Sequence, residues 1–407
     1  MLKLTVQDSI ETIDAARWDS AGSDPLSTHA VLAALERAAL PGVRIWYATI
    51  EDHNGRLLAA APICRIAVDG GRLTHGAFRF LIRTVRKWYP GFLRTALMAC
   101  GTPLSVANPP LRLARNADAV AVLRELAGLL RELGETERAP WLAFKEFSAS
   151  HLRAARTALL GQGAGWILAP SEPNSRIRIR WQSYDEYLTD LRSHYRYKVR
   201  SAARRLAQEG VIVDVVPLAE SYDSNLHALY EAVVERAAVQ LEHLTPEFFV
   251  ALGQAYPDTT PLIRFRCDGN VIGWVAMLLA GEMAYDLFHG IDYAENERTA
   301  LYFNQLAEVV RLTIERGARN LSLGQSTEIA KARFGGEPVP LWVALRHRSA
   351  AITALLRGGR PVLFPAKSVP PRHVFRDVEP CTGVGEPPPA PRPADPPSVT
   401  AQATAPA

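Results

Sequence analysis

The sequence predicts an α/β fold made of two similar halves and a disordered C-terminal tail. Helical and strand periodicities alternate over most of the chain, the order of predicted elements recurs from one half to the next, and proline dominates the end. A chain of 407 residues is long enough for two domains and a tail. We place the domains at residues 1–170 and 171–365 and the tail at 366–407.

The first half is predicted as a helix, a pair of strands, a second helix, a strand and a third helix. Apolar residues recur every three or four positions in the helices and alternate with polar ones in the strands. The predicted elements are helix 25–39, strands 45–50 and 57–66, helix 117–133, strand 141–147 and helix 151–160.

The second half follows a similar order. Asp268-Gly269-Asn270 joins two of its strands and predicts a tight hairpin, because Gly and Asn tolerate positive φ. The predicted elements are helix 183–209, strand 211–216, helices 222–237 and 246–255, and strands 262–267, 271–279 and 283–288.

A closing unit runs from Glu297 to Leu345. It contains a helix with one apolar stripe from Leu301 to Ile314, a helix-ending Gly317, a short strand at 320–323, a Gly-Gln-Ser-Thr loop and a last strand. Loops that follow strand ends often carry the site of an α/β domain, so we expect functional residues here.

The C-terminal tail is proline-rich and acidic. After Pro380 the chain has no aromatic residue and is rich in Pro, Ala, Gly and Thr, so it has little apolar surface to offset the entropy of ordering. The segment from Asp377 onward carries a net charge of −3. Because the whole chain carries +4, the rest of the chain carries +7. This basic excess suits an anionic substrate or cofactor.

Composition limits the class of protein. Hydrophobic residues make up 48% and charged residues 22%, as in ordinary globular proteins. The four cysteines are far apart and form no CxxC pair, so we expect a reducing compartment and no zinc site made of cysteines. No signal peptide or membrane-spanning run is recognisable, and we expect a cytoplasmic protein.

Three segments carry a family resemblance. SYDEYLTDLRSHYRYKVRSAARRL (183–206) has an Arg/Lys-rich helix pattern, and IRFRCDGNVIGWVAMLLAGEMAYDLFHGID (263–292) has a Gly-punctuated sheet pattern. ALYFNQLAEVVRLTIERGARNLSLG (300–324) is followed by AKARFGG (330–336). Together they resemble the GNAT-superfamily acyltransferases of the FemAB and CelD-like type, over about 181–348.

The resemblance implies two tandem GNAT-like domains with mixed, largely antiparallel sheets flanked by helices. It also implies N-acyl transfer to a small-molecule amine, with acyl-CoA as co-substrate and no permanently bound cofactor. One departure concerns the loop before the third GNAT helix, where backbone amides of [QR]-x-x-G-x-[GA] face the CoA pyrophosphate. Residues 296–300 lack these glycines and leave Arg298 and the helix start for phosphate, which keeps aminoacyl-tRNA open as the donor.

Asp286 and His289 are the first candidate catalytic residues. Strand alternation places Asp286 with Phe288 on one face and Leu287 with His289 on the other. Amine acylation needs a proton acceptor, which His289 can provide, and an Asp can orient it or act directly. The alternative is that His289 only ends the strand.

The next candidates lie in the closing unit. Tyr302 could donate a proton to a leaving group or an oxyanion, and Asn304 could bind amides of the donor. Gln325, Lys331 and Arg333 follow the loop, where cations could meet phosphate or carboxylate. The alternatives are aromatic packing at the helix start and solvated cations on a helix.

A basic stripe on the helix at 183–209 is another candidate binding surface. Arg192, Arg196, Arg200 and Arg204 are four residues apart and share one side of a helix without interleaved Glu. This side could hold CoA phosphates, a tRNA backbone or an anionic lipid carrier, or could simply be solvated. The Arg- and aromatic-rich segment 78–98 could contact a membrane peripherally, although ordinary buried structure is the simpler reading.

Three functions fit these observations. The first is an N-acyltransferase in which an amine attacks an acyl-CoA or related thioester directly, because no nucleophile elbow is recognisable. The second is an aminoacyl-tRNA-dependent transferase that forms a peptide bond on an envelope precursor or a metabolite. The third is an envelope or polysaccharide accessory protein that has lost catalysis.

Overall fold

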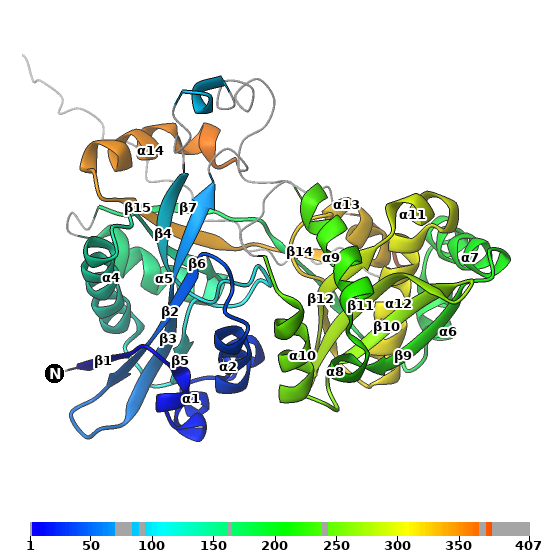
Figure 1. Cartoon of the computed structure of the whole chain (residues 1–407), viewed down its shortest axis with the longest axis horizontal. Coiled ribbons are helices and arrows are strands. Elements are labelled where there is room, and N and C mark those ends of the chain that lie inside the picture. Colours follow the sequence, from blue (N-terminus) through cyan, green and yellow to red (C-terminus); the bar gives the residue numbers. More distant parts are fainter. Residues whose placement is uncertain are drawn as a thin grey trace, which may run out of the picture.

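The structure is a computed structural model, and it describes residues 2–69, 84–88, 94–161, 165–237, 243–365 and 372–376. Two sheets, each flanked by helices, lie next to each other in the molecule (Figure 1). Both are mixed and largely antiparallel, which confirms the predicted fold class.

The first sheet is formed by β1 (Lys3–Gln7), β2 (Val43–Glu51), β3 (Leu57–Asp69), β4 (Arg94–Cys100), β5 (Arg112–Leu113), β6 (Trp141–Phe147), β7 (Ile167–Pro170) and β15 (Trp342–His347). Its order is β1-β2-β3-β4-β6-β15-β7, with β5 paired to β3. The neighbours are antiparallel except for β4 and β6, which a helical crossover joins in parallel.

The second sheet is formed by β8 (Asn174–Arg178), β9 (Ile212–Pro217), β10 (Pro261–Cys267), β11 (Asn270–Ala280), β12 (Met283–Ile291), β13 (Asn320–Ser322) and β14 (Glu337–Val339). Its order is β14-β8-β13-β12-β11-β10-β9. Again one pair is parallel, β12 with β13, and a long helix connects these two strands. The halves therefore share a meander, a helical crossover and a parallel strand.

Helices cover the faces of both sheets (Figure 1). Those of the first sheet are α1 (Ala15–Ser20), α2 (His29–Arg37), α4 (Ala119–Thr136), α5 (Ala149–Ala155) and α14 (Ala350–Leu363). Those of the second are α6 (Tyr184–Asp190), α7 (Ser193–Gln208), α8 (Leu218–Ser221), α9 (Ser224–Arg236), α10 (Pro246–Ala255), α11 (Tyr293–Thr299), α12 (Leu301–Glu315) and α13 (Glu328–Lys331). In the described part of the chain, no helix is both long and apolar enough to cross a bilayer.

One hydrophobic core joins the two halves. It includes Leu35 of α2 and Tyr47 of β2 together with Phe249 of α10, Trp274 of β11 and Phe288 of β12. Helices α2 and α10 pack on each other between the sheets (Figure 1). A second core lies under α6, α7 and α12, and a third lies under α4 and α5. The second sheet is therefore buried on both faces.

The strand pairing differs from the predicted division at residue 170. β15 pairs with β6 and β7, so it completes the first sheet, and α14 packs beside it. Both elements fall within residues 171–365, which were predicted as the second domain. Strand periodicity shows that a segment is extended but carries no information about which sheet it joins.

The predicted helix 183–209 is interrupted. Leu191 has φ −60° and ψ 139°, which ends α6, and α7 starts after Arg192. The cause lies near the C-terminus, because Leu191 bridges to Phe375 and the amide of Arg192 donates to the carbonyl of Val374 at 2.9 Å. Residues 372–376 of the predicted disordered tail are thus ordered against the second core, and its other residues lie outside the described ranges.

The predicted hairpin turn and the helix end at Gly317 are present, but the positive φ of the hairpin turn falls on Asp268 and Gly269 and not on Asn270. Asp268 and Gly269 have φ of 49° and 82° in the β10–β11 turn, and Gly317 has φ 70° after α12. These left-handed conformations favour residues with small or short polar side chains.

We predict that two mid-helix glycines respond oppositely to alanine. A Cβ at Gly253 of α10 would lie 2.5 Å from the backbone nitrogen of Ala219, so Gly253→Ala should lower the free energy of unfolding by about 1–3 kcal/mol. Gly128 of α4 has room for a methyl group, so Gly128→Ala should raise it by about 0.5–1 kcal/mol. Urea unfolding monitored by circular dichroism measures both, and equal effects would contradict the close packing of α10 on α8.

Candidate active site

The candidate site is organised by an irregularity in β12. Asp286 and Phe288 pair with consecutive residues of β11, so Leu287 is an extra residue, a β-bulge that breaks the alternation of side chains. Leu287 and Phe288 both pack on the core shared with the first half, whereas Asp286 and His289 come together on the face covered by α12. The expectation that Asp286 and His289 face opposite sides is therefore wrong.

His289 is oriented by Gln305 of α12. The Gln305 amide nitrogen donates to the carbonyls of Gly290, at 2.9 Å, and Trp274, at 3.2 Å, which fixes the direction of the side-chain amide. Its oxygen lies 3.1 Å from Nδ1 of His289, so we assign the proton of the ring to Nδ1. The other ring nitrogen, Nε2, is then the basic atom and faces Asp286 at 2.9 Å.

Asp286 is a buried carboxylate with no hydrogen-bond donor among the described residues. Its side chain is 1% exposed and neither oxygen accepts a hydrogen bond. The contact with His289 has the distance of an ion pair but lacks hydrogen-bond alignment. A buried carboxylate without donors is costly, and such groups are found preferentially at functional sites.

Lys331 contributes a buried cation to the same region. It ends α13, is 4% exposed, and its Nζ donates to the carbonyl of Gln325 at 2.7 Å. Burial lowers the pKa of Lys331 to about 8, while the negative charges of Asp286 and Glu328 act in the opposite direction. Lys331 is thus a group of the site that can exchange protons near neutral pH.

Tyr302 closes the site on the side of α12. Its ring centroid is 5.5 Å from that of His289, and its hydroxyl lies 2.6 Å from Oγ1 of Thr327. Burial raises the pKa of Tyr302 well above its usual value, so the hydroxyl remains a proton donor. Ser326 and Thr327 have φ of 63° and 52°, which is unfavourable backbone for Thr, and strain of this kind concentrates at functional sites.

The family of this chain follows from its similarity to known proteins. The FemAB-like family model, described as peptidoglycan biosynthesis/recognition, matches residues 9–357. The chain belongs to the FemAB-like family. This membership confirms the resemblance to FemAB-type proteins.

Individual relatives of this FemAB-like chain are distant. A putative 8-amino-7-oxononanoate synthase 2 of Mycobacterium tuberculosis is 24% identical over 318 residues, which are 77% of this chain but only 41% of the relative. Two solved structures share the fold. FemX has a TM-score of 0.52 at 11% identity and covers 87% of this chain and 99% of its own. The C-terminal domain (DUF2156) of a putative lysylphosphatidylglycerol synthetase from Agrobacterium fabrum has 0.50 at 13% and covers 89% and 98%.

Two residues predicted to bind the donor make internal contacts in the FemAB-like chain. Asn304 is buried, and its amide donates to the carbonyls of Thr299, Ala300 and Ala202 at 3.0–3.2 Å. Its side-chain nitrogen therefore joins α7 to the start of α12.

Arg298 is neutralised by carboxylates. Its guanidinium pairs with Glu209 and Glu295 and lies 3.8 Å from the sulfur of Cys267, at the turn between β10 and β11. The start of α12 is also occupied, because Asn296 accepts the amide proton of Tyr302 at 2.8 Å. The charge of Arg298 is therefore paired with carboxylates, and Arg298 brings no unpaired charge to the start of α12, where phosphate was expected to bind.

The other predicted binding residues separate into two groups. The Gln325 amide donates to the carbonyl of Glu172 at 2.8 Å, and its own carbonyl accepts from Lys331. The Arg333 side chain makes no hydrogen bond or ion pair with another described residue. The second group is formed by the arginines on the basic side of α7. Arg196 donates to the carbonyls of Thr189 and Leu191 at 3.0 Å, which caps α6.

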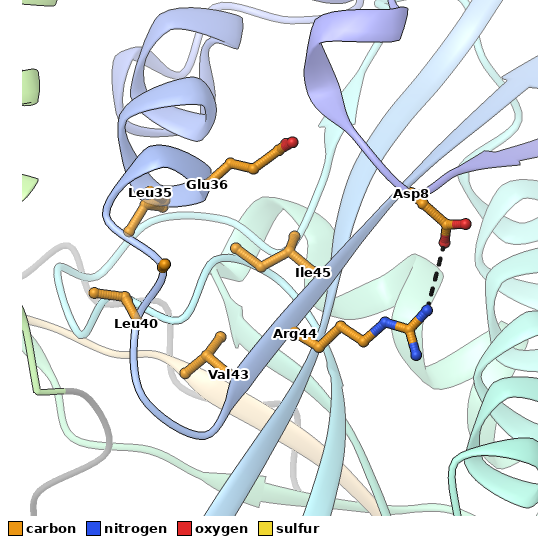
Figure 2. A pocket seen from close by; sticks show the side chains of 8 residues that line it. Asp8, Leu35, Glu36, Leu40, Val43, Arg44 and Ile45 are labelled. Carbon is orange, nitrogen blue, oxygen red and sulfur yellow. Dashed lines mark ion pairs between the residues drawn. The ribbon is translucent and has the colours of Figure 1, made fainter.

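Exposed cations remain on α7. Arg200 and Arg204 line an open hollow of about 570 Å³ with Tyr197, which is 64% exposed. Arg192 precedes the helix and binds the carbonyl of Phe375 at 3.2 Å, so the stripe is shorter than predicted. A smaller hollow of about 190 Å³ lies in the first half beside the Arg44–Asp8 ion pair (Figure 2). Most of segment 78–98, predicted as a possible membrane contact, lies outside the described residues.

The sequence analysis missed Gln305 and Thr327. Gln305 is fully buried within the apolar stripe of α12, and an uncharged polar residue in such a stripe was the available signal. Thr327 carried no signal, because its role depends on the left-handed turn that places it against Tyr302.

We predict that Lys331 makes stability depend on pH. Its pKa is about 8 in the folded chain and about 10.4 when unfolded, so between these values the unfolded chain binds more protons and stability rises with pH. The unfolding free energy of the parent relative to Lys331→Met should increase by about 1–3 kcal/mol from pH 7 to 10.

Urea unfolding of both proteins at several pH values measures this difference. Lys87→Met is the matched control, because Lys87 is exposed and its replacement should give no such slope. Parallel pH profiles for the parent and Lys331→Met would show that Lys331 is solvated.

Proposed function

We propose that this FemAB-like acyltransferase forms an amide by direct attack of a primary amine on an activated acyl ester or thioester. The observation that supports this proposal is the buried Asp286 carboxylate without a hydrogen-bond donor beside Nε2 of His289. Amine attack generates a proton that must leave the nitrogen, and this pair offers a place for it. The family description favours an amine of a cell-envelope precursor as the acceptor.

In the proposed step, the amine nitrogen forms a bond to the acyl carbon while the bond from that carbon to the leaving oxygen or sulfur breaks. The proton of the amine passes to Nε2 of His289, and the resulting imidazolium lies against Asp286. The same proton then protonates the leaving atom, so no covalent enzyme intermediate is required. Lys331 and the Tyr302 hydroxyl are the groups proposed to stabilise the developing oxyanion.

Aminoacyl-tRNA is the donor that we favour. Arg298 and the start of α12, the places expected for a CoA pyrophosphate, are occupied by Glu209, Glu295 and Asn296. The exposed cations of α7 suit a polyanion, whose phosphates release counterions on binding. Acyl-CoA is the competing donor, and the experiments below separate the two.

We predict that Asp286→Asn lowers turnover about 100- to 10,000-fold without lowering stability. The substitution keeps the shape of the side chain and removes a buried charge that has no hydrogen bond, so the melting temperature should stay equal or rise. Turnover is measured with the best amine acceptor from a screen, using charged tRNA and acetyl-CoA as donors.

Asp258→Asn, at an exposed position, is the control and should behave like the parent. His289→Gln should match the loss in Asp286→Asn, and the double variant should be little worse than either, because the two residues act as one unit. Full turnover in Asp286→Asn would remove the pair from the mechanism.

We predict that α7 binds the donor electrostatically. The Arg200→Gln/Arg204→Gln double variant should weaken tRNA binding and reduce the slope of log K against log salt by about 2, because two phosphate contacts are lost. Fluorescence anisotropy with labelled tRNA at several salt concentrations measures the slope.

The control is Arg115→Gln/Arg124→Gln, which removes two exposed arginines from the first half. Equal loss in both variants would indicate unspecific attraction. Thermal stabilisation of the parent by acetyl-CoA but not by tRNA would assign the donor to CoA and leave the Asp286–His289 mechanism standing.

A further inference from the structure

A cluster of metal-binding side chains lies away from the active site. His227 and Glu231 stand one turn apart on α9, and His243 follows in the segment before α10. Nε2 of His227 is 3.7 Å from Oε1 of Glu231, and Nε2 of His243 is 3.4 Å from the same oxygen. One ligand atom from each residue lies within 4.8 Å of the other two.

We propose that His227, Glu231 and His243 bind a divalent transition-metal ion, with zinc as the best fit. Two imidazoles and one carboxylate form a ligand set typical of zinc sites, and such a set leaves a fourth position for water. Ligands at about 2.0–2.2 Å from a tetrahedral ion lie roughly 3.3–3.6 Å from each other. The 3.4 Å separation of His243 from Glu231 falls within this range, and the 3.7 Å separation of His227 from Glu231 lies just above it.

The surroundings of His227 support the site. Its second ring nitrogen, Nδ1, lies 3.1 Å from the hydroxyl of Tyr222, which leaves Nε2 directed at Glu231. Metal-bound histidines usually make such a hydrogen bond through the other nitrogen, because it fixes the ring and the tautomer. The side chain of His227 is 13% exposed and stands against the rings of Tyr230 and Phe249, so its position is defined by packing.

The metal would link α9 to the segment just before α10, within the second half. His243 is close in sequence to Thr245, whose hydroxyl donates to the carbonyl of Ala38 at 3.3 Å, just after α2. Tying His243 to α9 therefore fixes the entry to α10, the helix that packs on α2. This role is independent of the Asp286–His289 pair, which lies on the other face of the second sheet.

The experiment uses the full chain without a purification tag, stripped of metal by a chelator and then titrated with Zn²⁺ by calorimetry. We expect one zinc per chain and a higher melting temperature in its presence. His243→Gln and Glu231→Gln should each weaken binding at least tenfold and abolish the thermal shift, because each removes a ligand. His53→Gln, at an exposed histidine of the first half, should bind like the parent.

Co²⁺ provides a second readout, since four-coordinate Co²⁺ absorbs strongly in visible light. The absorption should appear in the parent and in His53→Gln and be lost in both ligand variants, even if those variants were less stable. Zinc binding that is equal in all four proteins, or no zinc binding by the parent, overturns the proposal. Both results leave the proposed acyl transfer untouched.

Discussion

Burial of the second sheet on both faces is the constraint on which the site depends. Phe288 of β12 enters the core shared with the first half, while Ala284 and Ile291 enter the core under α12. A strand without a solvent face has no room for unpaired polar groups, so each one must be explained. The bulge at Leu287 changes the alternation within this strand and places Asp286 and His289 together.

The buried charges of the site lower the stability of the folded chain. Asp286 lacks hydrogen-bond donors among the described residues, and Lys331 is buried with a pKa lowered to about 8. Each is costly to fold, and the surrounding secondary structure holds them in place: β12 carries Asp286, α12 supplies Gln305 to orient His289, and the loop at Gln325 accepts a hydrogen bond from Lys331. Such preorganisation is what electrostatic stabilisation of an acyl-transfer transition state requires.

The chain path couples the site to the first half. Soon after Lys331, β14 pairs with β8 at the edge of the second sheet, and β15 then enters the first sheet between β6 and β7. The core around α2 and α10 joins the halves a second time. The two sheets therefore share a core, and the segment carrying Lys331 lies just before the chain passes from the second sheet to the first.

The sequence by itself determined the local elements and the residue types of the site. Helical stripes, the Asp268-Gly269 turn and Gly317 predicted element positions because these depend on neighbouring residues. Residue chemistry indicated Asp286, His289 and Tyr302 as candidates, and the family resemblance indicated Lys331. Only the tertiary structure decided which sheet β15 joins, that residues 374–375 interrupt the helix at Leu191, and that Asn304 and Arg298 are used internally. These outcomes depend on contacts between segments distant in sequence, which periodicity cannot encode.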